Sequence, residues 1–345
     1  MTTSKSASEE TNSVPNILDV TLRDGGYQNN WGFSQDDAVA IVGDLAAAGL
    51  EFIEIGYRNG PPGHDGAGLT GQCPDAYIQA LRVAVPKTKL SVMYHPGAVT
   101  ESDLAHLADL GVAMVRCSIP AGGLESALPL IKKAHDLGMI SCGNMTTVTE
   151  YTSEGVVDDA SRIVENGVSV LYVADSNGSM TPDSVRATFE LLKSRVPPVA
   201  LGFHNHNNLG LGMANAIEAM RAGVDYLDAS LRGMGRSAGN VPTESLIAFV
   251  NRQGAGPQID LLAALRIANY LVQRYGSADP APKLQDMALG AYDFFTNVQP
   301  FISSAAAEYD VSWYALIAKL AASGPDKPNI TLDVVRSVAR SIAES

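Results

Sequence analysis

The sequence predicts an α/β fold, a closed (β/α)8 TIM barrel with a helical C-terminal extension. Short apolar runs alternate with helical patterns eight times without a break, which is the repeat of this barrel. Several of the runs are almost wholly apolar, as parallel strands covered on both faces should be. Polar and charged residues follow several of the runs, as they do on the catalytic face of a barrel. An open, doubly wound sheet is the alternative arrangement of the same elements.

Each strand is predicted from a short apolar run bounded by turn residues. The segments between the runs, such as DDAVAIVGDLAAAG and LESALPLIKKAHDLG, carry apolar residues at three- and four-residue spacing, as amphipathic helices do. Most of these segments end in glycine, the usual helix stop. The predicted strands are Ile17–Leu22, Phe52–Gly56, Leu90–Tyr94, Ala113–Ser118, Met139–Asn144, Ser169–Ala174, Ala200–His206 and Tyr226–Leu231.

After the eighth predicted strand unit the pattern changes to helices with no strands between them. The segments IDLLAALRIANYLVQRY, FFTNVQPFISSAAAEY, SWYALIAKLAAS and TLDVVRSVARSIAE all have helical spacing. At the other end, MTTSKSASEETNSVP is polar and has no apolar core, so it is not a secretory signal. The sequence therefore predicts a disordered tail over 1–14, a barrel catalytic domain over 15–256 and a helical region over 257–345.

Composition and charge exclude several classes of protein. The 345 residues are 46% hydrophobic and 18% charged, which is typical of globular proteins. The net charge of −13 argues against nucleic acid or an anionic membrane as the main partner, since both need clustered lysine and arginine. No apolar run approaches the ~20 residues of a membrane span. Cysteines without metal-binding spacing indicate a reducing cytoplasm; they are Cys73, Cys117 and Cys142.

Two histidines stand at the end of the seventh predicted strand, in the run ALGFHNH. Because residues two apart in a strand point to the same side, His204 and His206 share one face. Two imidazoles at the carboxyl end of a barrel strand suit two adjacent positions on a transition metal ion. A lone histidine there would more often be a satisfied polar group, but the pair predicts metal ligands.

A third ligand is expected from the run LDVTLRDGGYQNNW at the first predicted strand. Strands one and seven are separated by a single strand when a barrel closes, so Asp24 is a suitable candidate. Two histidines and one carboxylate leave open positions for a chelating substrate or water. The neighbouring Arg23 could then bind an enolate oxygen or a carboxylate. A simple surface ion pair between Arg23 and Asp24 is the structural alternative.

Three motifs in the right order resemble the metal-dependent aldolase and lyase superfamily of TIM barrels, whose members are similar to HMG-CoA lyase. They are DVTLRDG at the first strand, GFHNHNNLGLGMANAIEA at the seventh and GRSAGNVPTE after the eighth. The likeness covers roughly residues 16–250. The helical C-terminal region, with ALGAYDFF, looks most like the 4-hydroxy-2-oxovalerate aldolase branch.

The resemblance implies roles for particular residues. Asp24, His204 and His206 would hold a divalent metal ion, with Mn²⁺ or Mg²⁺ expected first and Zn²⁺ or Co²⁺ also compatible. Arg23 would stabilise the enolate of a 2-oxo acid such as pyruvate. Asn240 stands where some members of the superfamily place a further side chain near the metal. The surrounding GMGRSAGN, residues 233–240, is equally consistent with an anion-binding loop and with a flexible connector.

One position departs from the pattern of the hydroxy-oxo-acid aldolases. Three residues after the metal-binding aspartate these enzymes have an acid/base histidine, and this chain has Tyr27. A tyrosine with a pKa near ~10 is a poor base at neutral pH, although it can donate a hydrogen bond. Proton transfer could instead involve His95, His64 or metal-bound hydroxide. The sequence leaves the base open, and a turn-capping role for His95 is the alternative.

The resemblance and the site residues together predict a carbon–carbon lyase of the aldolase type, which makes or breaks a bond next to a 2-oxo acid. The second hypothesis is a Claisen-type synthase or lyase that uses an acyl-CoA and a 2-oxo acid. The third is an inactive metal-binding barrel that acts as a partner protein. The relatives also suggest a homo-oligomer, and an aldehyde dehydrogenase as a partner that takes up the aldehyde.

Overall fold

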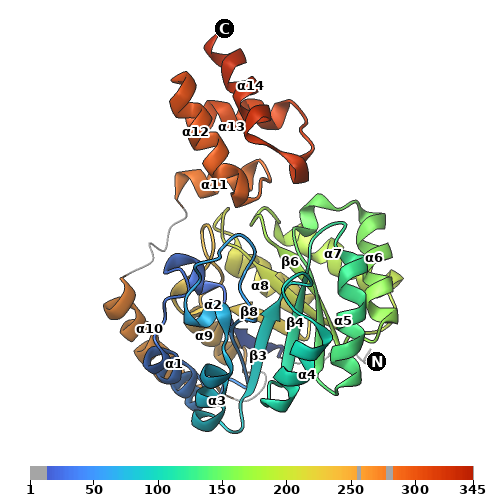
Figure 1. Ribbon diagram of the computed structural model, residues 1–345, viewed down its shortest axis with the longest axis vertical. Helices are drawn as coiled ribbons and strands as arrows, with labels where there is room; N and C mark the ends of the chain where they lie inside the picture. Colours follow the sequence, from blue (N-terminus) through green and yellow to red (C-terminus); the bar gives the residue numbers. More distant parts are fainter. Residues whose placement is uncertain (1–13, 255–257, 277–282, 345) are drawn as a thin grey trace, which may run out of the picture.

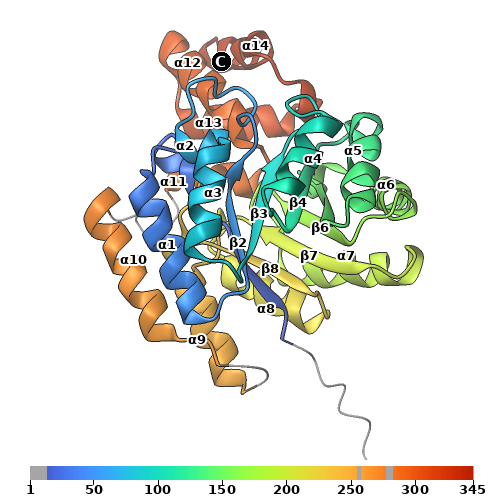
Figure 2. The same ribbon diagram turned by 60° about the horizontal axis from the view of Figure 1, so that its bottom comes forward.

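The computed structural model describes residues 14–254, 258–276 and 283–344. Eight parallel strands, paired in sequence order, close a barrel in which β1 also pairs with β8 (Figures 1 and 2). The predicted TIM barrel is therefore confirmed. The strands are β1 (Asn16–Asp19), β2 (Phe52–Tyr57), β3 (Lys89–Tyr94), β4 (Met114–Ile119), β5 (Ile140–Met145), β6 (Val170–Asp175), β7 (Ala200–Asn205) and β8 (Tyr226–Ala229).

Helices cover the outside of the barrel and bury their apolar faces against the strands. Several begin at a side chain that accepts a hydrogen bond from a backbone N–H of the first turn, as at Ser34, Thr100, Thr152 and Thr181. The helices of the barrel are α1 (Gln35–Ala48), α2 (Leu69–Gln72), α3 (Asp75–Ala84), α4 (Glu101–Asp109), α5 (Leu124–Asp136), α6 (Ser153–Glu165), α7 (Pro182–Arg195), α8 (Gly212–Arg221) and α9 (Thr243–Gln253).

The interior of the barrel is layered, with apolar side chains below a charged layer. The charged layer comes from the even-numbered strands, as alternation in such barrels requires, and consists of Glu54, Arg116, Tyr172 and Asp228. The guanidinium carbon of Arg116 lies 4.1 Å from the centroid of the Tyr172 ring. Gly202 of β7 makes room for that ring, because a Cβ there would lie 2.5 Å from it. Two residues earlier on the same strands stand Phe52, Met114, Val170 and Tyr226.

The first strand is shorter than predicted. It ends at Asp19 instead of Leu22, because the chain turns where the Asp19 carboxylate accepts hydrogen bonds from Thr21 N (3.0 Å) and Thr243 Oγ1 (2.6 Å). The backbone N–H of Asp24 then donates to the carbonyl of Val20 at 2.8 Å. The turn brings Arg23 and Asp24 back over the mouth of the barrel.

The C-terminal helices divide into two groups by what they pack against. Helix α10 (Leu261–Tyr275) packs on α1 and shares the core of the barrel. The remaining helices enclose a core of their own, built around Leu289, Phe294, Ile302 and Leu316. We call residues 284–344, with these helices and the loops between them, the cap. Its helices are α11 (Leu284–Ala291), α12 (Gln299–Tyr309), α13 (Trp313–Ala322) and α14 (Leu332–Ala343).

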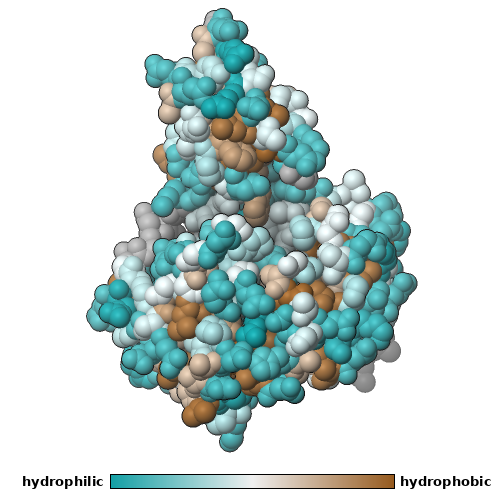
Figure 3. Space-filling model, viewed as in Figure 1, coloured by the Kyte–Doolittle hydropathy of each residue, from teal (hydrophilic) through white to brown (hydrophobic). Residues whose placement is uncertain are grey.

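The cap stands over the mouth of the barrel and forms a separate lobe that is narrower than the barrel (Figure 3). Asp293 of the cap holds it to the loops after β5 and β6: its Oδ1 accepts hydrogen bonds from Thr149 Oγ1 (2.7 Å), Asn177 Nδ2 (2.9 Å) and Ser179 Oγ (2.6 Å). Helices are thus present where the sequence predicts them. The predicted tail, up to residue 13, and the predicted boundary at 256–257 lie outside the described residues.

None of the helices in the described ranges is long and apolar enough to cross a membrane.

Candidate active site

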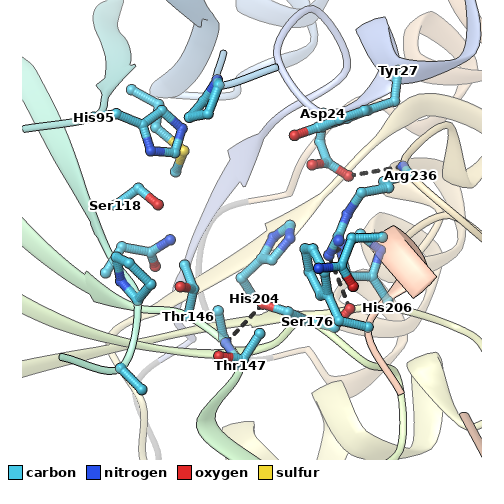
Figure 4. Close-up of a pocket in the computed structure, with 18 of the residues that line it drawn as sticks. Asp24, Tyr27, His95, Ser118, Thr146, Thr147, Ser176, His204, His206 and Arg236 are labelled. Carbon is cyan, nitrogen blue, oxygen red and sulfur yellow. Dashed lines mark hydrogen bonds between the residues drawn. The ribbon is translucent and has the colours of Figure 1, made fainter. Parts of the chain in front are cut away.

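Three side chains meet at the mouth of the barrel, from β7 and from the turn after β1. Asp24, His204 and His206 are buried, and each offers a ligand atom within 4.8 Å of the other two (Figure 4). The convergence expected from the sequence therefore exists in the fold. His206 lies just beyond β7, where its backbone forms an isolated bridge with Asn240.

Both histidines have one ring nitrogen engaged by a neighbouring acceptor. His204 Nδ1 donates to Asp228 Oδ2 at 2.9 Å, and His206 Nδ1 donates to the Gly239 carbonyl at 3.1 Å. Nε2 is therefore the nitrogen in each ring that could bind a metal ion, and such outer partners are the usual support of metal-binding histidines. Burial lowers the pKa of His206 to about 3, so its ring is neutral at physiological pH.

Asp24 is ionised and firmly held. Burial opposes its ionisation, but the charge of the adjacent Arg23 holds the pKa of this carboxyl well below its ordinary value. Asn240 Nδ2 donates to Asp24 Oδ2 at 2.8 Å, while its own Oδ1 is buried without a partner. Gly235 keeps this place open, because a Cβ there would lie 2.7 Å from Asp24 Oδ2. One carboxylate, two imidazole Nε2 atoms and an unpartnered amide oxygen fit a divalent cation.

The charged layer connects Arg23 to His204. Arg23 Nε donates to Glu54 Oε1 and its Nη1 to Asp24 Oδ1, both at 2.5 Å. Arg116 donates to both Glu54 oxygens at 3.0 Å and to Asp228 Oδ2 at 2.6 Å. Arg23 Nη2 is buried and has no partner. Arg23 is thus fixed by two carboxylates and keeps one donor for the cavity.

Tyr27 and His95 both line the cavity, on different sides of it (Figure 4). Tyr27 packs edge-on against Trp31, with ring centroids 4.5 Å apart. Burial, followed by the nearby Tyr27 hydroxyl, raises the pKa of Tyr57 well above its ordinary value. His95 stacks on Tyr57, and its Nε2 is buried without a partner. Burial, and then Arg23, lower the pKa of His95 to about 4, so its ring is neutral.

His64 is exposed but packs its ring on Tyr27 at 5.5 Å between centroids.

The cavity above the three converging side chains has a volume of about 340 Å³ and is closed in part by the cap. Its size suits a small acid. Sequence reasoning missed several of its residues. Arg236 carries a weak signal, a cation within the glycine-rich run GMGRSAGN after the last strand, whereas the cap residues carry none. The missed residues that line the cavity include Ser118, Thr146, Ser176, Arg236, Phe295, Asn297 and Lys327.

Gly26, the second glycine of the LRDGGY motif, has a packing role that can be tested. A Cβ on Gly26 would overlap the indole of Trp31, which is fully buried and donates from Nε1 to the Arg23 carbonyl at 2.6 Å. We expect Gly26→Ala to lower the free energy of unfolding by about 1–3 kcal/mol, the usual cost of overpacking. Urea denaturation would measure the loss.

Gly43→Ala is the matched control for this substitution. Gly43 lies in α1 with open space around its Cβ position, so alanine there should be neutral or stabilising by up to ~1 kcal/mol. Equal stability of the two variants would contradict the packing role of Gly26.

Comparisons with known proteins agree with the geometry. The model of the HMGL-like family matches residues 14–271. The chain is 33% identical over 258 residues to a 4-hydroxy-2-oxovalerate aldolase of Moorella thermoacetica, covering 74% of this chain and 76% of that protein. It is 33% identical over 251 residues to an oxaloacetate decarboxylase of Mycobacterium tuberculosis, covering 73% and 74%.

Among solved structures, an HMG-CoA lyase from Bacillus subtilis superposes with a TM-score of 0.68 at 19% identity, covering 79% of this chain and 97% of that chain. This likeness shows the fold alone. The family match covers most of the barrel and its three motifs, which confirms the resemblance predicted from the sequence. The chain belongs to the HMGL-like family.

Proposed function

We propose that this chain is a divalent-metal-dependent aldolase that cleaves a 4-hydroxy-2-oxo acid into pyruvate and an aldehyde. The observation that carries the proposal is the convergence of Asp24, His204 and His206, with both Nδ1 atoms already engaged, beneath a cavity that the cap partly closes. Its support among relatives is the named activity of the Moorella thermoacetica protein.

In this proposal Asp24, His204 and His206 hold the ion, with Mn²⁺ or Mg²⁺ expected before Zn²⁺ or Co²⁺. When bound, the ion would act as a Lewis acid towards the oxygens of a 2-oxo acid. Asn240 orients Asp24 through its amide N–H. Arg23 presents its unpartnered Nη2 to the oxo oxygen, where negative charge develops as the carbon–carbon bond breaks.

Cleavage also requires that the C4 hydroxyl lose its proton. Tyr27 lines the cavity and can hold that hydroxyl by a hydrogen bond, taking the place of the histidine of related aldolases. His95 is neutral, with its buried Nε2 free to accept a proton. We assign binding of the hydroxyl to Tyr27 and acceptance of the proton to His95. A base with a pKa near 4 is weak, so we expect slow turnover.

The test measures the release of pyruvate from 4-hydroxy-2-oxovalerate. Lactate dehydrogenase and NADH are added so that pyruvate formation is monitored continuously. We expect release that depends on added Mn²⁺ and stops with a chelator. A series of 4-hydroxy-2-oxo acids with different C4 substituents would identify the aldehyde. Absence of pyruvate from every member of the series, with Mn²⁺ bound to the protein, would refute the aldolase assignment.

Decarboxylation of oxaloacetate is the second candidate, and the tyrosine at position 27 favours it. Loss of CO₂ produces the same enolate and needs no acceptor for a hydroxyl proton, so a site without a strong base suffices. The similar protein of Mycobacterium tuberculosis bears this name. Because free metal ions decarboxylate oxaloacetate slowly, the rate must be compared with that of His204→Ala. Pyruvate from oxaloacetate alone would favour this candidate.

The partner of His204 gives a prediction about metal affinity. Asp228 Oδ2 accepts hydrogen bonds from both His204 Nδ1 and Arg116 Nη2. The negative charge of Asp228 therefore orients the His204 ring and fixes the proton on its Nδ1. We expect Asp228→Asn, which keeps the volume, to weaken Mn²⁺ binding by about 10–100-fold, as losses of such outer partners do. Titration with a competing fluorescent chelator measures the change. The control is Asp225→Asn, at an exposed position preceding β8, which should bind Mn²⁺ normally. An unchanged Mn²⁺ affinity in Asp228→Asn would contradict the role of Asp228 in supporting His204.

A cytoplasmic location remains a prediction from the cysteines, and a homo-oligomer and an aldehyde dehydrogenase partner remain predictions from the resemblance.

A further inference from the structure

The site contains two arginines whose charges are compensated very differently. Arg23 forms ion pairs with Asp24 and Glu54, each at 2.5 Å. Two carboxylates already balance its charge, so it can donate one hydrogen bond but has little charge left to attract an anion. This leaves open which group recognises the carboxylate of a 2-oxo acid.

Arg236 reaches the same cavity and has no carboxylate within 4.0 Å of its guanidinium among the described residues. Neutral groups hold it instead. Its Nη2 donates to the Ser176 carbonyl at 2.9 Å, and its Nη1 donates to Thr296 Oγ1 of the cap at 3.2 Å. The guanidinium carbon lies 3.9 Å from the ring centroid of Phe295. A half-buried cation fixed by neutral partners retains its charge for an anionic ligand.

The position of Arg236 relates it directly to the three converging side chains. Its Nη2 lies 3.4 Å from His206 Nε2, the nitrogen that could bind a metal ion (Figure 4). A metal ion bound at that nitrogen would lie close to the Arg236 guanidinium, and the two positive charges would repel each other strongly in a poorly hydrated site. An anion lying between them would remove the repulsion, and a carboxylate has an oxygen for each.

The formal charges support the same arrangement. Five of the charged side chains form one ion-paired cluster, namely Arg23, Arg116, Asp24, Glu54 and Asp228. Arg236 adjoins this cluster through its backbone N–H, which donates to Asp24 Oδ2 at 3.3 Å, so that three arginines stand with three carboxylates. Their charges cancel, so a divalent cation would leave two positive charges in a largely buried site. The enolate of pyruvate, with its carboxylate, carries two negative charges and would restore neutrality.

We infer that Arg236 binds the carboxylate of the 2-oxo acid and thereby couples metal binding to substrate binding. Arg23 then serves the oxo oxygen, and the two guanidiniums have separate tasks. This inference rests on the proposed metal-dependent function. Because coupling between two ligands is reciprocal, an anion held by Arg236 must tighten the metal as much as the metal tightens the anion.

The experiment measures Mn²⁺ affinity with and without oxalate, a dianion that resembles the enolate of pyruvate. Free Mn²⁺ is followed by its electron paramagnetic resonance signal. We expect oxalate to tighten Mn²⁺ binding to the wild-type protein by about tenfold or more. In Arg236→Gln we expect Mn²⁺ alone to bind at least as tightly as in the wild type, because the repulsion between the ion and the guanidinium is removed. Oxalate should then increase the Mn²⁺ affinity of this variant by only about twofold or less.

Two further variants separate this role from general effects. Arg232→Gln removes an equal charge from the same loop, where the guanidinium pairs with Glu244, and should keep the full oxalate effect. Arg236→Lys keeps the charge and should retain part of the effect, which a misfolded variant would not.

The outcomes distinguish this inference from the function on which it rests. Full oxalate coupling in Arg236→Gln would overturn the role of Arg236 and leave the metal site intact. Failure of the wild-type protein to bind Mn²⁺ at all would overturn the proposed function, and the inference with it.

Discussion

Replacement of His204 by alanine is expected to abolish stoichiometric Mn²⁺ binding and to reduce pyruvate release by at least ~10³-fold, the scale of losing a principal source of electrostatic stabilisation. The ring offers one of three atoms that could bind a metal ion and that lie within 4.8 Å of one another. Alanine leaves a cavity and also removes the hydrogen-bonding partner of Asp228. Metal analysis after dialysis, together with the coupled pyruvate assay, measures both effects.

The matched control is His135→Ala, an exposed histidine in α5 on the outside of the barrel. It removes the same side chain at a distance from the cavity, so metal content and rate should be unchanged. Equal metal content in His204→Ala and the wild-type protein would show that the converging side chains are not the ligands. Circular dichroism of both variants checks that the barrel is intact.

The parts of the site that the sequence predicts are those that local spacing determines. His204 and His206 share a face because strand residues alternate, and they remain together in the fold. Asp24 could be added because a closed barrel brings the first and seventh strands near each other. These expectations needed only the strand positions, and the structure reproduces those positions to within a few residues.

The charged layer could not be predicted from local spacing in the same way. Glu54, Arg116 and Asp228 each stand in an otherwise apolar strand, a visible signal of a special interior position. Their pairing depends on the stagger of three different strands, which sequence spacing does not give. The cap residues that line the cavity were harder still to predict from the sequence. Phe295 and Lys327 reach the cavity because the separate core of the cap packs in a particular way, and sequence spacing does not determine that packing.

The end of β1 shows how a side chain can override an apolar pattern. The run Ile17–Leu22 predicts a strand throughout, but Asp19 and Thr243 form a hydrogen bond that begins a turn inside it. Without that turn Arg23 would continue away from the barrel. The turn places its guanidinium between Glu54 and Asp24.

Replacement of Arg23 by lysine is therefore expected to reduce kcat by about 10²–10³-fold, the usual cost of losing a donor to a developing oxyanion. A lysine ammonium carries its three N–H donors on a single nitrogen, so it cannot occupy the three separate positions from which the guanidinium pairs with Glu54 and Asp24 and presents a donor to the cavity. Glu54 keeps its two bonds from Arg116 at 3.0 Å, which limits the loss of stability.

The measurement must separate this chemical role from support of the metal site. Arg23→Lys should still bind Mn²⁺, because Asn240 continues to hold Asp24 and both histidines keep their partners. Single-turnover pyruvate release at saturating Mn²⁺ should then be slow, with little change in oxalate affinity, since Arg236 is assigned to the carboxylate. A variant that binds Mn²⁺ and retains more than about a tenth of the wild-type rate would contradict the assignment of Arg23 to the oxo oxygen, because a lost oxyanion donor costs more than that.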